Sequence, residues 1–446
     1  MAINGLMIDC ARLMDLHHYY FRLVDLMAEW KMNLLMLHFS DDHGCSIALP
    51  GFKELSHPNA FQPNEIKKLV KYARERGIEV VPELETFGHT RFITDHPNYE
   101  HLYAGRKTKQ IEFNAIDPQN PETHKLMQKL IRATARMFPS EYFHIGCDEV
   151  NLSDYCAERD LDPTEVYVDY VNRMIALARD AGKTPMFWAD HAVKDPKVAE
   201  GLDKNAVAVF WNYRKDISDA GLKALKKAGF KKTACAPSVA SFGYRFLPTE
   251  HALGNVDRMA AHARKHKSLG VITTVWCPYR YIQGAIDYGI AYAAERVRTT
   301  KGFSRATFNK HFADKVFGTK LTQPLRQFLS GYPKLEITAD LAEKLHNRDA
   351  DLTEDQQKRV DRTNEAWQKI RHVLQDYTPK KNEDTWEAMK LAAYAAGICS
   401  QWFELAQEDK VSARERTMFN ILLREVRRSV ASMWDATRYA DDPQKR

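Results

Sequence analysis

Long apolar runs and recognisable cysteine patterns are both missing from this chain. The 446 residues contain no uninterrupted apolar run of about 18 residues, which excludes an ordinary transmembrane helix. The seven cysteines show no C-x-x-C or Cys/His metal spacing, so we expect mostly free thiols rather than a disulfide framework. No charged start followed by an apolar stretch opens the sequence, so we expect no signal peptide and a cytoplasmic location, unless a leader precedes Met1.

Clustered charge and glycine-rich turns are also scarce. The net charge is only +6 and the Lys and Arg residues are scattered, so we expect neither a nucleic acid nor a membrane surface as a partner. No glycine-rich phosphate turn follows an early strand-like run, which weighs against a doubly wound nucleotide-binding sheet. No internal repeat is evident.

Alternation of short apolar runs with amphipathic helical stretches dominates the first 300 residues. Such alternation predicts a parallel sheet covered on both faces, and eight repeats predict a (β/α)8 barrel over residues 1–300. From residue 301 to 446 the strand signals fade, and we expect an all-helical C-terminal domain that includes Asp340–Gln375, Glu383–Gln407 and Ser412–Tyr439. The expected strands are Gly5–Cys10, Asn33–Ser40, Ile78–Leu84, Tyr142–Asp148, Thr184–Asp190, Ala206–Asn212, Lys232–Ser238 and Gly270–Trp276.

Two adjacent carboxyl groups, Asp148 and Glu149, stand at the end of the fourth expected strand. Neighbouring acids at the end of an apolar strand repel each other and lose solvation, which tends to raise one pKa. A carboxylic acid that holds its proton near neutral pH suits glycoside cleavage, because it must protonate a poor leaving group. An ordinary solvated Asp-Glu pair in a loop is the alternative, so the pair gains weight only from the rest of the chain.

The other expected strands also end in polar and aromatic residues. Because the chemistry of a (β/α)8 barrel sits at the carboxyl ends of its strands, these side chains should gather at one mouth. At least three tryptophans are among them, which a purely structural role does not explain. The residues are Asp9, Arg12, His38, Asp41, Asp42, His43, Glu83, Glu85, His89, His144, Trp188, Asp190, His191, Trp211, Tyr213, Tyr244, Trp276, Tyr279 and Tyr281.

Four segments, in this order, resemble the catalytic domain of glycoside hydrolase family 20, the β-N-acetylhexosaminidases. They carry a first strand with an arginine, a second strand with an Asp-Asp turn, a third strand with a Gly-His pair, and an Asp-Glu signature. The segments are Gly5–Arg12, Asn33–Gly44, Gly77–His89 and His144–Val150. Trp188, Asp190 and Trp211 extend the likeness, which covers roughly residues 5–290.

The resemblance implies an exo-acting, retaining β-N-acetylhexosaminidase that removes terminal N-acetylglucosamine or N-acetylgalactosamine. In this family the substrate's own 2-acetamido oxygen attacks the anomeric carbon, an exception to the usual two-carboxylate mechanism. The implied acid and base is Glu149, and Asp148 would accept a hydrogen bond from the acetamide N–H. Tyr244 is the candidate for holding the acetamide oxygen. Asp41 and His89 would form a relay that supports Glu149.

Sugar-binding residues follow from the same resemblance. Arg12 would bind hydroxyls, since a guanidinium offers a planar fork of donors. Tryptophans would enclose the sugar ring and the acetamide methyl. The implied set is Arg12, Trp188, Asp190, Trp211, Tyr213 and Trp276, with a terminal N-acetylhexosaminide as the partner and with no metal and no cofactor. The oligomeric state is left open, a homodimer being one option.

The chain departs from the family pattern in several places. Cys147 replaces the usual glycine before the acid pair, and His43 and Cys45 flank the glycine of the second turn where a glutamine and a tryptophan are usual. Trp276 is followed by Cys277 and Pro278 instead of the usual Trp-x-Glu, whose acid grips outer hydroxyls. The usual Tyr-x-Asp spacing is not found after the seventh expected strand, and we expect no small α/β domain before the barrel. These changes resemble a hexosaminidase D-like branch and leave the preferred sugar open.

Two rival interpretations use the same residues. His38, Asp41, Asp42, His43 and His89 are plausible ligand types for a metal-dependent hydrolase, although later strands end mainly in tryptophan. A catalytically weak or inactive amino-sugar-binding barrel is the second rival, and the departures near the eighth strand keep it open.

Overall fold

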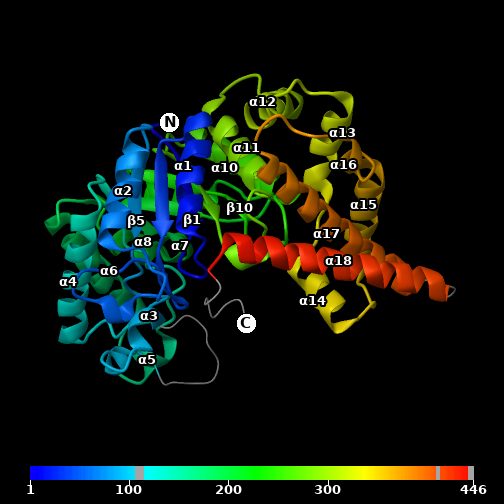
Figure 1. Ribbon diagram of the computed structural model, residues 1–446. Helices are drawn as coiled ribbons and strands as arrows, with labels where there is room; N and C mark the ends of the chain where they lie inside the picture. The colour runs from blue at the N-terminus through cyan, green and yellow to red at the C-terminus, as the bar shows by residue number, and fades with distance from the viewer. Residues whose placement is uncertain (106–114, 408–411, 440–446) are drawn as a thin grey trace.

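The computed structural model describes residues 1–105, 115–407 and 412–439, and its centre is a closed parallel barrel (Figure 1). Eight strands follow one another around the barrel, and the last pairs in parallel with the first. This arrangement confirms the predicted (β/α)8 architecture. The strands are β1 (Ile3–Asp9), β2 (Leu34–His38), β5 (Glu79–Glu83), β6 (Tyr142–His144), β7 (Thr184–Trp188), β8 (Val207–Trp211), β9 (Thr233–Ala236) and β11 (Gly270–Val275).

Proline interrupts the seventh strand. The run expected as Lys232–Ser238 divides into β9 and the short β10 (Ser238–Ala240), with Pro237 between them. Because proline has no backbone N–H, it cannot continue the ladder. Its carbonyl still accepts the N–H of Thr274 at 2.8 Å, which keeps the two pieces attached to β11.

Helices cover the outside of the barrel between successive strands. Their apolar faces are buried against the strands, which explains why every barrel strand is nearly continuous in apolar residues. The larger ones are α1 (His17–Glu29), α2 (Pro63–Arg74), α4 (Pro121–Met137), α6 (Pro163–Asp180), α9 (Ala220–Lys227), α10 (Glu250–Lys265) and α11 (Asp287–Arg298). Short elements in the loops are the hairpin β3 (Ser40–Asp41) and β4 (Gly44–Cys45), and the helices α3 (Arg91–Thr94), α5 (Ser153–Ala157), α7 (Asp190–Lys194) and α8 (Pro196–Gly201).

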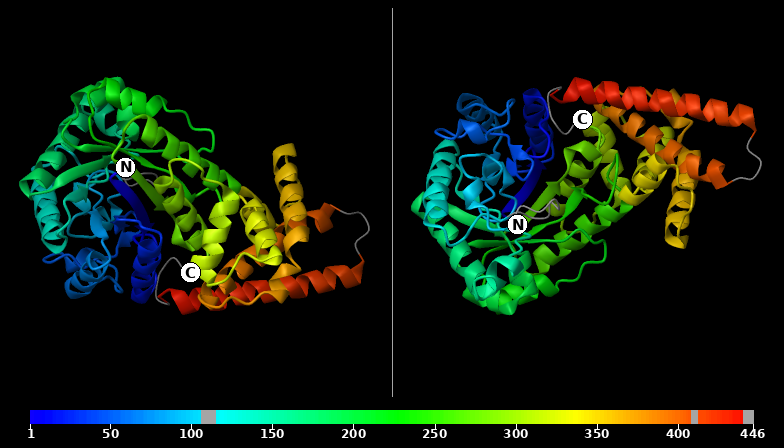
Figure 2. Two further views of the ribbon diagram at one scale, coloured as in Figure 1. Left: turned by 90° about the horizontal axis from the view of Figure 1, so that it is seen from above. Right: turned by 90° about the horizontal axis from the view of Figure 1, so that it is seen from below.

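A helical region follows the barrel and packs on one flank of it (Figure 2). Trp386 fills its centre and contacts the rings of Phe317, Phe328 and Tyr377. The run expected at Asp340–Gln375 is divided into three helices. The region contains α12 (Arg305–Phe317), α13 (Gln323–Gly331), α14 (Ala339–Asn347), α15 (Glu354–Ile370), α16 (Val373–Asp376), α17 (Glu383–Gln407) and α18 (Ala413–Thr437). The exact division at residue 300 stays a prediction.

The chain returns to the barrel at the end of α18. Arg438 is buried there, where its guanidinium pairs with Asp15 at 3.4 Å and donates to the carbonyl of Pro278 at 2.9 Å and of Tyr281 at 3.1 Å. Leu16 N–H also donates to the carbonyl of Thr437. The last turn of α18 is therefore fixed to the loops around the barrel mouth.

Two predictions from the sequence concern the state of the cysteines and whether any helix could span a membrane. All seven cysteines are buried free thiols, as expected from their spacing. Among the described helices, none combines the length and apolarity that crossing a bilayer requires.

Barrel closure depends on a close backbone approach between β11 and β1. Gly270 lies opposite Ile3, and a Cβ added at Gly270 would stand 1.9 Å from the Ile3 carbonyl oxygen. We expect Gly270→Ala to reduce the free energy of unfolding by about 3 kcal/mol, since packed backbone cannot move aside cheaply. Urea denaturation would measure this loss. Gly243→Ala is the control, because nothing lies within 4 Å of that position. Equal stability of the two variants would contradict the closure argument.

Candidate active site

A small cavity opens at the carboxyl ends of the barrel strands. Its volume is about 150 Å3. It collects nine of the eleven residues predicted as catalytic or sugar-binding, together with His38 and Phe242. The lining residues are Arg12, His38, Asp41, His89, Asp148, Glu149, Trp188, Trp211, Tyr213, Phe242 and Trp276.

Buried charges of alternating sign run beneath the cavity. Arg12 pairs with Asp9 at 2.9 Å and with Asp41 at 2.7 Å. His38 then pairs with Asp41 through Nε2 at 3.2 Å and with Glu83 through Nδ1 at 3.1 Å. These five residues come from the ends of β1, β2 and β5 and from the turns that follow them. A continuous set of ion pairs therefore joins neighbouring strands.

The pKa shifts of His38 and Asp41 favour the charged form of each. Burial alone would lower the pKa of His38, but Glu83 and Asp41 outweigh it and raise the pKa to about 10. Burial would likewise raise the pKa of Asp41, yet Arg12 and the hydrogen bonds from two histidines hold it well below its usual value. A buried charge without a partner destabilises the folded state, and pairing each charge with one of opposite sign reduces that cost.

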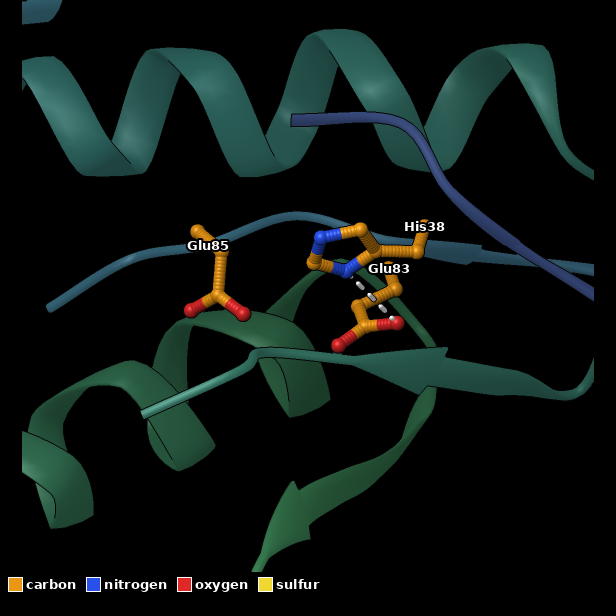
Figure 3. A group of neighbouring side chains, drawn as sticks. All are labelled: His38, Glu83 and Glu85. Atoms are coloured by element: carbon orange, nitrogen blue, oxygen red, sulfur yellow. Dashed lines mark ion pairs between the residues drawn. The ribbon is translucent and has the colours of Figure 1, made fainter. Parts of the chain in front are cut away.

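Glu85 differs from its neighbour Glu83. Figure 3 shows His38 joined to Glu83, with Glu85 beside the pair and not joined to it. One Glu85 oxygen accepts the N–H of Cys147 at 3.3 Å. Burial and the nearby Asp148 raise the pKa of Glu85 well above its usual value.

The Asp-Glu pair lies on a backbone turn with left-handed conformations. Gly146, Cys147 and Glu149 have φ values of 67°, 72° and 51°. Two of these residues are not glycine, so the turn is strained and must be held by its surroundings. The hydroxyl of Tyr167 donates to the Cys147 carbonyl at 2.8 Å, while the Cys147 N–H donates to Glu85.

Asp190 and His191 hold the far side of the same turn. The Glu149 N–H donates to Asp190 Oδ2 at 3.3 Å, and the Val150 N–H donates to His191 Nε2 at 3.1 Å. Asp190 is expected from the sequence as a sugar-binding residue, but it does not belong to the cavity lining. It contacts the backbone that carries Glu149.

Asp148 lies deeper than Glu149. The Asp148 side chain is 12% exposed, whereas the Glu149 side chain is 36% exposed. Burial raises the pKa of Asp148 to about 7, with His89 acting in the opposite direction and Asp190 and Glu149 adding to the rise. The Asp148 Oδ1 atom is buried and accepts no hydrogen bond from the described part of the chain. A ligand N–H would satisfy it.

His89 connects this pair to the Asp-Asp turn. Its Nε2 lies 3.5 Å from Glu149 and 3.9 Å from Asp148, and its Nδ1 lies 3.3 Å from Asp42 and 3.7 Å from Asp41. The imidazole is thus nearer to Asp42 than to Asp41, the partner expected from the sequence. Burial would lower the pKa of His89, but the surrounding carboxylates raise it well above its usual value.

Aromatic rings form the walls of the cavity. Trp188 and Trp276 lie 6.1 Å apart between centroids, and Trp211 stacks on Tyr213 at 5.3 Å. The indole N–H of Trp276 donates to the Tyr213 oxygen at 2.6 Å, so the phenol's own proton is not used in that bond. Phe242 completes the wall, where the Arg12 guanidinium lies 5.3 Å from its centroid.

Tyr244 does not belong to this wall. Its ring packs on His251 at 5.2 Å, and its backbone pairs with Thr338 in the helical region. The tyrosine that the structure brings into the cavity is Tyr213, which the sequence placed at the end of the sixth strand. Phe242 carried no sequence signal, because a phenylalanine in a loop has no periodic pattern to mark it.

Metal-type donors gather at three places among the described residues. The two histidines involved, His38 and His89, face carboxylates on both ring nitrogens, and both have raised pKa values. The groups are His38, Glu83 and Glu85; Asp41, Asp42 and His89; and His89, Asp148 and Glu149.

The barrel mouth combines a carboxyl pair, a buried arginine and tryptophan walls. These features are typical of a glycoside hydrolase. The chain belongs to glycosyl hydrolase family 20, since the model of the family's catalytic domain matches residues 3–276. This confirms the family that the four sequence segments resemble.

Known proteins agree with this assignment. The chain is 27% identical over 236 residues to a β-N-acetylhexosaminidase of Cellulomonas fimi, covering 48% of this chain and 43% of that protein. It is 26% identical to the β-hexosaminidase subunit beta of Mus musculus, covering 52% and 46%. The chain therefore spans less than half the length of these two relatives.

Solved structures share the fold. The exo β-N-acetylglucosaminidase of Vibrio harveyi, in complex with N-acetylglucosamine, superposes with a TM-score of 0.57 at 22% identity, covering 70% of this chain and 56% of that one. The chitobiase of Flavobacterium johnsoniae superposes with a TM-score of 0.57 at 18% identity, covering 95% and 78%. The second match extends over most of the helical region as well.

The left-handed turn should tolerate no side chain at Gly146. A Cβ there would lie 1.9 Å from Glu85 Oε2. We expect Gly146→Ala to reduce the free energy of unfolding by about 3 kcal/mol and to displace the Asp-Glu pair. Gly182→Ala is the matched control, since Gly182 also has a positive φ of 79° but has nothing within 4 Å, and should cost only about 1 kcal/mol. Thermal and urea unfolding of both variants would measure the difference, and equal losses would contradict the clash.

The raised pKa of Asp148 makes stability depend on pH. The native protein retains a proton up to about pH 7 that the unfolded chain releases near pH 4, so this group's stabilising contribution is lost as pH rises through that window. Asp148→Asn removes the titration. Relative to the original chain, the variant should therefore gain about 2 kcal/mol of stability between pH 5 and pH 8. Denaturation at both pH values tests this, with Asp154→Asn on exposed α5 as control; a gap that does not change with pH would refute it.

Proposed function

We propose that this chain is an exo-acting, retaining β-N-acetylhexosaminidase that uses the substrate's 2-acetamido group as nucleophile. The observation that carries the proposal is the buried, unsatisfied Oδ1 of Asp148 next to Glu149 at the cavity rim. An acetamide N–H is a donor that suits this oxygen. The cavity of about 150 Å3 suits one terminal sugar rather than the interior of a polymer.

The different burial of the two acids divides their roles. Glu149 is the more exposed of the two, so it protonates the leaving oxygen as the bond to the anomeric carbon breaks and the acetamide oxygen attacks that carbon. Glu149 then accepts a proton from the water that opens the bicyclic intermediate, which retains the configuration. The ionised form of Asp148 holds the acetamide N–H and stabilises the positive charge that develops on this group.

The remaining cavity residues position the sugar. Arg12 offers donors to sugar hydroxyls, and Tyr213, in place of Tyr244, donates its hydroxyl proton to the acetamide oxygen. His89 acts on Glu149 as a positioning residue and is supported from behind by Asp42 together with Asp41. Trp188, Trp211 and Trp276 pack against the ring and the acetamide methyl.

Loss of either acid should nearly abolish turnover. We expect Glu149→Gln to lower kcat on natural glycosides by about a thousandfold or more, since the leaving oxygen loses its proton source. Asp148→Asn should lower kcat by about a hundredfold, because the developing charge loses its counter-charge. Rates on aryl N-acetyl-β-glucosaminide and N-acetyl-β-galactosaminide measure both effects, and Asp154→Asn should leave them unchanged.

Product analysis completes the test. Proton NMR of the first-released sugar should show the β anomer. An inverted product would exclude acetamide participation. Tight binding of N-acetylglucosamine with no turnover of either aryl glycoside would favour the inactive amino-sugar-binding alternative.

A further inference from the structure

Two neighbouring loops at the mouth of the barrel carry positive charge and no carboxylate. The loop after β10 contains Arg245 and the loop after β11 contains Arg280, and no Asp or Glu occurs in residues 241–249 or 277–286. The Phe246 N–H donates to the Arg280 carbonyl at 2.8 Å, which joins the two loops. The two arginines therefore belong to one surface.

This surface adjoins the catalytic cavity at Phe242. The Arg280 guanidinium carbon lies 5.2 Å from the centroid of the Phe242 ring, which lines the cavity and is 44% exposed. The Arg12 guanidinium carbon lies 5.3 Å from the same centroid. Burial raises the pKa of the Cys277 thiol, and Arg12 and Arg280 both act in the opposite direction. Arg280 and Arg12 thus flank one ring and one thiol at the edge of the cavity.

Arg245 and Arg280 differ from Arg12 in their counter-charges. Arg12 is paired with Asp9 and Asp41. In the part of the chain that the structure describes, no carboxylate pairs with Arg245 or Arg280, and the buried Nε of Arg280 makes no hydrogen bond. Burial lowers the pKa of Arg245, and the neighbouring Arg280 lowers it further. Two guanidinium groups that repel each other would both be stabilised by an anion beside them.

Backbone strain occurs in the same two loops. Phe246 has a φ of 71° and Cys277 a φ of 58°, although neither residue is glycine. Hydrogen bonds hold both residues, since the Cys277 N–H donates to Asp9 at 3.1 Å and the Phe246 N–H to Arg280. Strained conformations of this kind are concentrated at ligand-binding and active sites.

The barrel places this surface across the cavity from the catalytic acids. The strand before Asp148 and Glu149 is β6, which is four strands from β11 in either direction around the barrel. In the proposed reaction Glu149 acts at the anomeric carbon of the sugar. Carbon 4 is opposite the anomeric carbon in a pyranose ring, so the outer hydroxyls are directed away from Glu149 and toward Arg12 and Arg280. A substituent on the exocyclic 6-hydroxyl extends furthest in that direction.

We propose that Arg280 and Arg245 bind an anionic ester, a sulfate or a phosphate, on the 6-hydroxyl of the terminal N-acetylhexosamine. The inference rests on the proposed function and names its substrate more closely. A guanidinium offers a planar fork of donors that matches two oxygens of such an ester. The opposite edge of the cavity carries Asp148 and Glu149, which repel an anion, so the two edges together orient the sugar.

Hydrolysis of three matched substrates tests the proposal: an aryl N-acetyl-β-glucosaminide, its 6-O-sulfate and its 6-O-phosphate. For at least one ester we expect kcat/KM to exceed that of the unsubstituted glycoside by about tenfold or more, since hydrogen bonds to a charged group contribute about that factor. The ester with the larger ratio identifies which anion the site prefers. Raising the salt concentration from about 0.02 M to about 0.5 M should reduce the ratio severalfold, because these charges are partly exposed and are screened.

Matched variants locate the effect. Arg280→Gln should lower the ratio of ester to unsubstituted kcat/KM by about tenfold, and the double variant with Arg245→Gln should bring it to about one or below. Arg326→Gln removes the same charge from an exposed position on α13 and should retain the full ratio. Urea unfolding checks that each variant folds. Arg280→Gln should not reduce stability, because it removes the repulsion of Arg245.

The outcomes separate this inference from the function on which it rests. Turnover of the unsubstituted glycoside with no preference for either ester overturns the assignment of the arginines alone. A preference that the double variant leaves unchanged also overturns it, because the anion then binds elsewhere. If none of the three glycosides is hydrolysed, the proposed function is wrong, and the inference falls with it.

Discussion

The buried chain of alternating charges is the feature on which the mouth of the barrel depends. Asp9, Arg12, Asp41, His38 and Glu83 are each paired with a neighbour of opposite sign, and all are nearly inaccessible to solvent. Removing one partner from such a set leaves an uncompensated buried charge, which typically costs about 3–5 kcal/mol. The set also extends across the barrel: the Cys277 N–H after β11 donates to Asp9, and the Trp188 indole at the end of β7 donates to Glu83. One network therefore fixes the relative positions of five strand ends.

The turn that carries Asp148 and Glu149 lies next to this network, and its backbone is strained. Its left-handed residues persist because Glu85, Tyr167 and Asp190 hold its backbone from different sides. Two carboxyl groups are thereby kept close to each other and to His89, although their repulsion would otherwise separate them. The strained backbone thus carries the two acids whose charge changes in the proposed reaction. The buried network of ion pairs supports this backbone.

The helical region packs against one flank of the barrel and contacts the loops around its mouth. Arg438 brings the end of α18 to the loops around the mouth, and the loop that carries Phe242 reaches into the helical region at Tyr244 and Phe246. The part of the chain beyond the match to the family model thus contacts loops at the barrel mouth.

Local patterns in the sequence determined the barrel and most of its catalytic mouth. Apolar runs alternating with amphipathic helices can bury both faces only as a parallel barrel or sheet, and parallel strands bring their ends together, so Asp148, Arg12 and three tryptophans could be placed in one cavity before any coordinates. Tertiary structure alone decided the rest. Tyr213 rather than Tyr244 faces the cavity, Asp42 lies nearer to His89 than Asp41 does, and Asp190 supports a backbone turn, because the direction of a loop side chain depends on neighbours far away in sequence.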